Sequence, residues 1–106
     1  MKVWESAEIE RRELIPGGHV SFVHTESMTL AYWDFDPDVL VPEHGHPHEQ
    51  VTNVIEGVFD MTIEGETIRL EAGSALVIPP DAVHYGRSVT KCRILDVFHP
   101  VREDYR

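Results

Sequence analysis

The sequence predicts an all-β fold, an antiparallel barrel or sandwich formed by one domain of 106 residues. Short runs rich in Val, Ile, Phe and Thr are separated by Gly, Pro and Asp at regular spacing, the pattern of many short strands joined by turns. Almost no segment has a helical periodicity. Six of the 7 prolines fall where a strand is expected to end or bend, namely Pro37, Pro42, Pro47, Pro79, Pro80 and Pro100.

The predicted strands begin in the N-terminal third, which is expected to give one or two. Further strands are predicted at residues 27–35 and 51–55. At residues 59–63, Phe, Met and Ile alternate with polar residues, and residues 67–70 run back with two apolar side chains. Because the intervening Glu-Gly dipeptide is typical of a tight turn, we expect a hairpin that is half buried on each arm.

The C-terminal part contains two more predicted strands. Residues 74–78 form a nearly continuous apolar run, which is consistent with a strand in a barrel wall. Residues 93–98 are predicted to form the last strand. The sequence leaves open whether residues 101–105 form a short helical turn.

Composition excludes several classes of partner. The 19 acidic and 9 basic residues give a formal net charge of −10, which repels phosphate backbones, so we expect no nucleic-acid partner. No run approaches the roughly 18 apolar residues of a membrane span, and the N-terminus lacks the apolar segment of a secretory signal. The single cysteine, Cys92, cannot form an internal disulfide, which favours a cytoplasmic location.

Histidines cluster in one short segment. His44, His46 and His48 occupy alternate positions, and Gln50 continues the same spacing. Alternate side chains of an extended chain point to one face, so neutral imidazoles here can converge on one ion. His84 ends a second, largely apolar segment. A lone histidine is more often structural, but this spacing predicts a metal site.

The first segment resembles a motif of the cupin superfamily of small β-barrel proteins. That motif is His-x-His, three or four residues, Glu, six residues and Gly. His44, His46, Gln50 and Gly57 keep these spacings, with Gln in place of Glu. The motif covers about residues 44–57.

The second segment resembles the other cupin motif, which is Gly, five residues, Pro-x-Gly, two residues and His. Gly73, Pro79 and His84 reproduce it, with Asp81 in place of Gly; Asp tolerates turn conformations well. This motif covers about residues 73–88. The resemblance implies that the whole chain is a single cupin domain, an antiparallel β-barrel of the double-stranded β-helix or jelly-roll type.

The resemblance also implies that His44, His46, Gln50 and His84 hold one divalent metal ion. All four ligands are neutral, so the ion keeps its full charge, which favours Lewis-acid work or binding of an anionic substrate over redox chemistry. Ni, Zn, Mn and Fe all accept such ligands, and the sequence does not distinguish them. A register that pairs His46 with His48 leaves a threonine as the next ligand, so we place His48 beside the site.

The last predicted strand and the residues after it carry three further candidates. Asp96 and Phe98 share one face of the strand, and Arg102 follows it. A carboxylate beside a cation should stay ionised and still be able to exchange a proton with a bound substrate. An arginine can form a bidentate pair with a substrate carboxylate.

Together with the two motifs, the C-terminal pattern Asp-Val-Phe-x-Pro-x-Arg-x-Asp-Tyr resembles the pectin-degradation cupins called KdgF. That resemblance implies conversion of 4,5-unsaturated uronate monosaccharides, the products of pectin and alginate lyases, to the linear 5-keto-4-deoxyuronate. The substrate would be a small anionic sugar. By the same resemblance, Asp96 would be the acid/base, Phe98 would pack on the sugar and Arg102 would bind its carboxylate.

Two other functions stay open at this point. One is a metal-dependent dioxygenase, because some cupin-like dioxygenases use three histidines and no anionic ligand. The other is a non-catalytic cupin that binds a small molecule. Resemblance to related barrels also implies a homodimer, with the apolar residues Val20, Phe22 and Val23 as a candidate edge.

Overall fold

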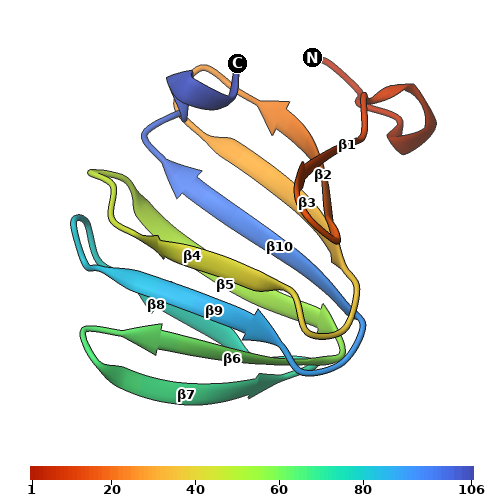
Figure 1. The fold of residues 1–106 in the computed structure, drawn as a ribbon. Helices are drawn as coiled ribbons and strands as arrows, with labels where there is room; N and C mark the ends of the chain where they lie inside the picture. The colour runs from red at the N-terminus through yellow and green to blue at the C-terminus, as the bar shows by residue number, and fades with distance from the viewer.

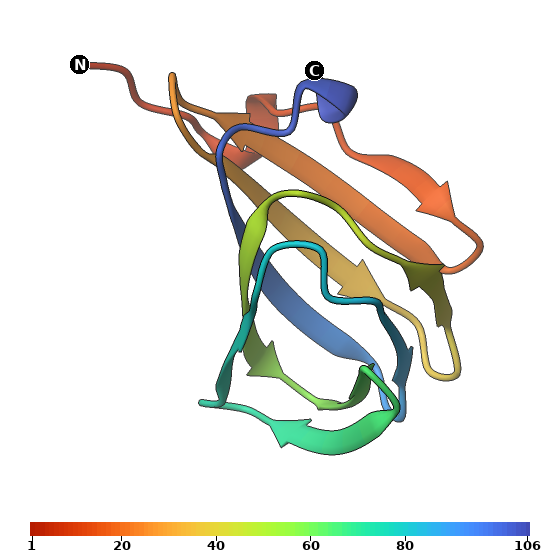
Figure 2. The same cartoon turned by 90° about the vertical axis from the view of Figure 1, so that its left-hand side faces the viewer.

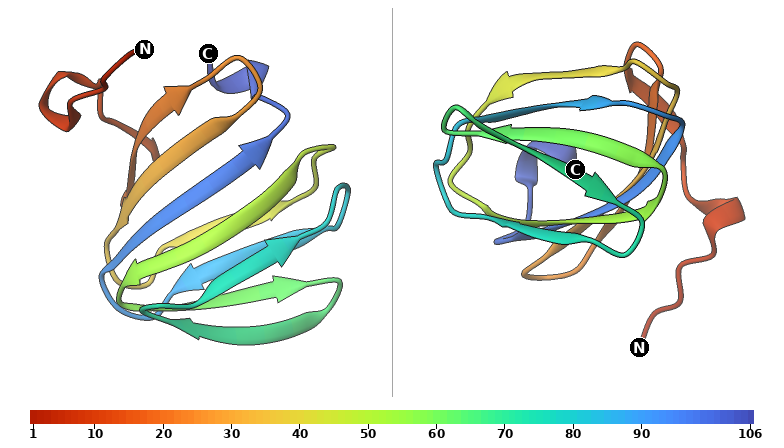
Figure 3. Two further views of the ribbon diagram at one scale, coloured as in Figure 1. Left: turned by 180° about the vertical axis from the view of Figure 1, so that it is seen from behind. Right: turned by 90° about the horizontal axis from the view of Figure 1, so that it is seen from below.

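The computed structural model describes residues 1–106, and two antiparallel sheets make up most of it (Figure 1). The six-stranded sheet contains, in spatial order, β1 (Arg12–Ile15), β2 (Gly18–His24), β3 (Thr29–Phe35), β10 (Cys92–His99), β5 (Glu49–Glu56) and β8 (Ala75–Ile78). The four-stranded sheet contains β4 (Leu40–His44), β9 (His84–Ser88), β6 (Val58–Ile63) and β7 (Glu66–Glu71). The two sheets face each other around a common interior (Figure 2, Figure 3). The predicted all-β jelly roll is confirmed.

Burial alternates along the central strands of the larger sheet. In β3, Ala31, Trp33 and Phe35 are buried, while the residues between them are more exposed. The same alternation places Val20 and Phe22 of β2 in the interior. The predicted dimer edge is therefore wrong at Val20 and Phe22, because both side chains face the core; Val23, the third residue of that edge, is only partly buried.

The hairpin β6–β7 is confirmed. Glu64 and Gly65 connect its arms with φ angles of 48° and 82°, the left-handed pair that a two-residue hairpin turn requires. The second arm is less buried than the sequence predicted. Ile68 is 47% exposed, because β7 is the last strand of the smaller sheet and only Leu70 reaches the core.

Two strands, β4 and β9, were not predicted from the sequence, and both carry candidate ligands. β4 lies at the edge of the smaller sheet, where Pro42 costs no ladder hydrogen bond. Its register with β9 shifts between Val41 and His44, which indicates a bulge. Beyond this bulge, His44 lies directly opposite His84. The bulge makes β4 irregular and therefore difficult to predict from the sequence. The same bulge places His44 opposite His84.

The core fills the space between the sheets. Fourteen buried apolar residues form one cluster, namely Val20, Phe22, Ala31, Trp33, Phe35, Val39, Val54, Phe59, Met61, Leu70, Ile78, Cys92, Ile94 and Phe98. Within it Phe35 stacks on Trp33 with ring centroids 4.9 Å apart and lies 5.7 Å from Phe59. These three rings concentrate apolar burial at the end of the interior where β3 ends and β10 begins.

The last glycine of the first motif, Gly57, has a structural role. Its φ is +92°, and an added Cβ would lie 2.2 Å from the carbonyl oxygen of Lys91. Glycine is therefore required twice over at this position, for its backbone conformation and for the close approach of the neighbouring chain.

The chain ends lie outside the two sheets. A short 3-10 helix, η1 (Ser6–Glu8), precedes β1, and a second, η2 (Glu103–Tyr105), follows β10 and covers one end of the larger sheet (Figure 1). Tyr105 of η2 stacks on Phe22 at 4.5 Å, so the open question about residues 101–105 is answered by a short helical turn. The structure holds no helix of the length and apolar character needed to cross a bilayer.

Candidate metal centre

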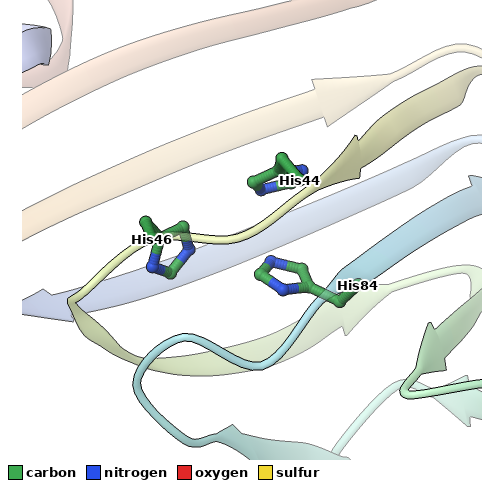
Figure 4. A group of neighbouring side chains, drawn as sticks. All are labelled: His44, His46 and His84. Atoms are coloured by element: carbon green, nitrogen blue, oxygen red, sulfur yellow. The ribbon is translucent and has the colours of Figure 1, made fainter.

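Three histidines meet beside the interior, with their rings close together (Figure 4). His44 is the last residue of β4, His46 lies in the loop after it, and His84 is the first residue of β9. One nitrogen from each ring lies within 4.8 Å of the others, close enough for all three to reach one ion after small ring rotations.

Main-chain carbonyls fix the tautomer of all three rings. Nδ1 of His44 lies 2.7 Å from the carbonyl oxygen of Pro42, and Nδ1 of His84 lies 2.8 Å from that of Ala82. Nδ1 of His46 lies 3.0 Å from the carbonyl oxygen of His48. A carbonyl only accepts, so each Nδ1 carries the proton and each Nε2 keeps a free lone pair, the arrangement usual for metal-binding histidines.

Burial keeps two of these rings neutral. It is the main cause that lowers the pKa of both His46 and His84, and the positive charge of Arg102 acts in the same direction. Nε2 of His84 is buried and has no hydrogen-bond partner. A buried lone pair without a partner is costly, and a cation between the rings would satisfy it. The donor set therefore fits a divalent metal ion.

Gln50 supplies the fourth candidate ligand. Its side chain is buried, and its Oε1 lies 2.9 Å from Nε2 of His46. Because the proton of His46 is on Nδ1, these two atoms face each other as acceptors. A cation held by both atoms would satisfy this pair of facing acceptors. The structure thus brings together the four residues that the sequence predicted as ligands.

Asp96 faces the same interior from β10, directly opposite Thr52 of β5. Burial raises its pKa to about 6, while the hydrogen bond from Thr52 acts in the opposite direction. The sequence predicted a carboxylate kept ionised by a neighbouring cation. In the protein without an ion, desolvation is the larger effect, so this carboxyl is half protonated at about pH 6 and holds its proton far more readily than an ordinary aspartate.

Phe98 and Arg102 lie together beside the histidines. The Phe98 ring meets His46 edge-on at 5.6 Å, and the guanidinium of Arg102 lies over Phe98 at 4.8 Å and over Tyr105 at 4.2 Å. Arg102 is buried and already forms a bidentate pair with Asp104, at 2.9 and 2.7 Å. The two guanidinium nitrogens that were expected to bind a substrate carboxylate therefore bind Asp104 instead. The remaining nitrogen, Nη1, is buried and has no hydrogen-bond partner.

His48 contributes to the site through its main chain. Its carbonyl oxygen orients His46, while its own ring lies 5.5 Å from the His46 ring and 6.5 Å from Phe98. The sequence analysis placed this residue beside the site, and the geometry agrees. Two other residues, Thr52 and Tyr105, were not predicted from the sequence as part of the site, although both line the cavity described below. The period of two along β5 from Gln50 was the available signal for Thr52.

A cavity of about 200 Å³ connects the two ends of the interior. Its polar lining comes from His44, Gln50, Thr52, His84 and Asp96 at one end. At the other end, Trp33, Phe35, Phe59, Met61 and Ile94 form an apolar wall. The cavity is thus of the size of a small molecule, with donors and acceptors gathered on one side.

Comparisons with known proteins agree with this architecture. Residues 31–98 match the cupin domain family. The structure of KdgF from Halomonas sp. superposes with a TM-score of 0.93 at 27% identity, covering 100% of this chain and 99% of that one. An RmlC-like cupin from Shewanella frigidimarina superposes with a TM-score of 0.91 at 26% identity, covering 97% of this chain and 94% of that one. A salicylate 1,2-dioxygenase from Pseudoaminobacter salicylatoxidans, at 16% identity, shares the fold alone.

Sequence relatives match over shorter regions. The polyketide synthase CurC of Streptomyces cyaneus is 38% identical over 64 residues, which is 59% of this chain. The uncharacterised HTH-type transcriptional regulator YobQ of Bacillus subtilis is 34% identical over 71 residues, or 63% of this chain. The matched regions span 42% and 30% of the lengths of these two proteins.

Proposed function

The chain belongs to the cupin family, and on that premise we propose that it is a metal-dependent enzyme that converts 4,5-unsaturated uronate monosaccharides to the linear 5-keto-4-deoxyuronate. The observation that carries the proposal is the convergence, beside one cavity, of the three-histidine cluster with Asp96 and Phe98. The likeness of the whole chain to KdgF from Halomonas sp. supports the same reaction.

His44, His46, Gln50 and His84 would hold the ion. When bound, a divalent ion coordinated only by neutral ligands would supply a strong positive charge that polarises substrate oxygens. The chain prepares the site by presenting three Nε2 lone pairs, each fixed by a hydrogen bond at Nδ1. Its surroundings are largely apolar, which strengthens electrostatic interactions inside the cavity.

The reaction needs one proton transfer and no oxidant. The ring oxygen of the unsaturated sugar joins C1, a hemiacetal carbon, to C5, an enol-ether carbon. When the C1–oxygen bond breaks, the C1 hydroxyl loses a proton and becomes an aldehyde, and the former ring oxygen keeps the bonding electrons and stays on C5 as an enolate. C4 then gains a proton and C5 becomes a ketone, so the net change is an isomerisation. Asp96, with a pKa of about 6, can both give and take a proton near neutral pH.

Phe98 and Arg102 would bind the substrate. The Phe98 ring lines the cavity next to the histidines and offers an apolar face to the sugar. Nη1 of Arg102, buried and without a partner, would donate to the substrate carboxylate. This local positive charge matters because the chain as a whole carries a formal net charge of −10 and would otherwise repel an anion.

The test is a substrate assay combined with metal analysis of the same preparation. Unsaturated uronate released by a pectin or alginate lyase is incubated with the protein under nitrogen, and the absorbance of its C4=C5 double bond is followed. The proposal expects decay faster than the spontaneous rate, abolished by a chelator and restored by a divalent metal. An unchanged rate with fully metallated protein would rule the reaction out.

The apolar wall of the cavity supports a second candidate, a three-histidine dioxygenase acting on an aromatic or aliphatic compound. The rings of Phe35 and Phe59 offer no hydrogen bonds to sugar hydroxyls, and Trp33 has only its indole N–H to donate. This function would appear in the same preparation as bound iron and oxygen uptake, with no effect on the unsaturated uronate. Without either activity, the cavity would serve as a binding site alone.

We further propose that the protein forms a homodimer through the outer face of the larger sheet. Five aliphatic residues lie in register across five neighbouring strands, namely Val23, Leu30, Val97, Val51 and Val77. Val77 is 58% exposed. A continuous apolar row on an outer sheet face is typical of an association surface. Light scattering on the 12.1 kDa chain would give twice this mass for a dimer.

A further inference from the structure

Thr52 lies between the candidate metal ligand Gln50 and the proposed proton carrier Asp96. It is 1% exposed and faces the interior from β5, two residues after Gln50 on the same side of the strand. It is also paired directly with Asp96 across the β5–β10 ladder. Its hydroxyl oxygen lies 2.9 Å from Nε2 of Gln50 and 2.7 Å from Oδ1 of Asp96.

The direction of these two hydrogen bonds follows from the groups involved. The amide nitrogen of Gln50 can only donate, so the Thr52 oxygen accepts from it. The single proton of the Thr52 hydroxyl is then left for Asp96, whose ionised carboxylate can only accept. While Asp96 is ionised, both bonds are satisfied at once when the Gln50 amide nitrogen points to Thr52 and its oxygen points to His46.

We propose that Thr52 is a positioning residue: its hydroxyl selects the amide face that Gln50 presents to the metal and holds the Asp96 carboxylate toward the cavity. An amide rotated by half a turn would present its NH2 group, which cannot ligate a cation. The role toward Gln50 needs only that a metal binds here. The role toward Asp96 rests on the function proposed above.

The substitution Thr52→Val removes the hydroxyl and keeps the branched shape. It removes the acceptor 2.9 Å from the Gln50 nitrogen and the donor 2.7 Å from Asp96 Oδ1, so each group loses the bond that holds it in this orientation. Removing a residue that orients a ligand typically costs about 10- to 100-fold in metal affinity. We expect a loss in this range for Thr52→Val, together with a fall in kcat of at least about tenfold and little change in KM. Thr52→Ser keeps the hydroxyl and should restore both.

Thr62 provides a matched control. It is also buried, in β6, and its hydroxyl bonds to Thr67 at 2.7 Å rather than to a candidate ligand or Asp96. Thr62→Val removes a buried hydroxyl of the same kind and should leave metal affinity unchanged. A general packing or folding effect of losing a buried threonine hydroxyl would appear in both variants.

The experiment is a Co²⁺ titration of the full chain, followed by its visible absorption, for the wild type and the three variants. Steady-state kinetics on the unsaturated uronate follow at saturating metal. Weaker Co²⁺ binding by Thr52→Val alone, restored in Thr52→Ser, would support the proposal. Wild-type affinity in Thr52→Val, an equal loss in Thr62→Val, or no restoration by Thr52→Ser would overturn it. If Thr52→Val does not fold, Thr52→Ala replaces it.

The two readouts separate this proposal from the proposed function. If the wild-type protein binds Co²⁺ but does not turn over the uronate, the function fails, and the titration still decides the role of Thr52 toward Gln50. If turnover occurs and only the affinities fail to differ, the function stands and the positioning role is wrong.

Discussion

The two ends of the interior are built in opposite ways. At the ligand end, formed by His44, His46, Gln50 and His84, polar side chains are held by hydrogen bonds, and a buried Nε2 lacks any partner. At the aromatic end, formed by Trp33, Phe35 and Phe59, rings stack on one another and leave almost no exposed surface.

The same strands therefore supply residues for function at the ligand end and residues for stability at the aromatic end. Packed rings contribute free energy of folding, whereas unpaired buried polar groups cost it. β10 contributes to both ends, since it begins beside Phe35 and continues past Asp96 to Phe98. We therefore expect substitutions at the ligand end to change chemistry and those at the aromatic end to change the free energy of unfolding.

The largest effect is expected at the ligand end, for Asp96→Asn. Asparagine keeps the shape of the side chain but cannot carry the proton to C4, so turnover should fall by about 10³-fold or more. Metal content should be unchanged, because Asp96 is not a ligand. Kinetics and metal analysis on one preparation check this. Retained activity would remove Asp96 from the mechanism.

The corresponding substitution at the aromatic end is Phe35→Ala. It removes a ring that is 3% exposed, stacks on Trp33 and packs at a tilt against Phe59, so the free energy of unfolding should fall by roughly 3–5 kcal/mol. Urea unfolding measures this loss. Metal affinity of the folded fraction should stay within about twofold of the wild type. A tenfold weaker affinity would show that the two ends are not independent.

A third prediction is that the ligand end reduces stability. A carboxyl whose pKa is raised from 3.8 to about 6 on folding stabilises the protein most at low pH, and this contribution is lost as pH rises from about 4 through 6. Above pH 7 the ionised Asp96 then costs about 3 kcal/mol in metal-free protein. Metal-free Asp96→Asn should be more stable than the wild type at pH 8, with the difference disappearing near pH 4. Equal urea midpoints at both pH values would contradict this.

The smallest changes in activity and stability are expected for Arg102→Lys. This substitution should affect both substrate binding and the free energy of unfolding. Lysine keeps the charge but cannot form the two-pronged pair with Asp104 or stack flat between Phe98 and Tyr105. We expect a loss of roughly 1–2 kcal/mol in the free energy of unfolding and a roughly tenfold higher KM. An unchanged KM with lower stability would assign Arg102 to structure alone.

Sequence reasoning was most successful where local pattern determines the outcome. Alternation of apolar residues predicted the β6–β7 hairpin and β3, and motif spacing predicted that His84 would join His44 and His46. It failed where a strand forms only because two distant segments pair with each other. β4 and β9 lack an apolar alternation, because Pro42 and Gly86 interrupt them and their polar residues line the cavity.

The candidate site shows the same division. The four candidate ligands could be predicted because they lie in two short motifs that resemble those of cupins, and that resemblance implied that His84 would join the residues of the first motif. The hydrogen bonds of Thr52 could not, because Thr52 and Asp96 are 44 residues apart and meet only through the β5–β10 register. The pairing of Arg102 with Asp104 also could not be predicted. It depends on how the chain turns after β10, and hydrophobic periodicity in the sequence does not indicate that turn.

The central claim is that one divalent ion binds at the ligand end through His84 together with residues of the first motif. Calorimetric titration of metal-free protein with Ni²⁺ tests it, with His99→Ala as a control because His99 is exposed at the end of β10. The account predicts one ion per chain, an affinity lowered by roughly 100-fold or more in His84→Ala, and no change in His99→Ala. No stoichiometric binding, or equal affinities in all three proteins, would contradict it.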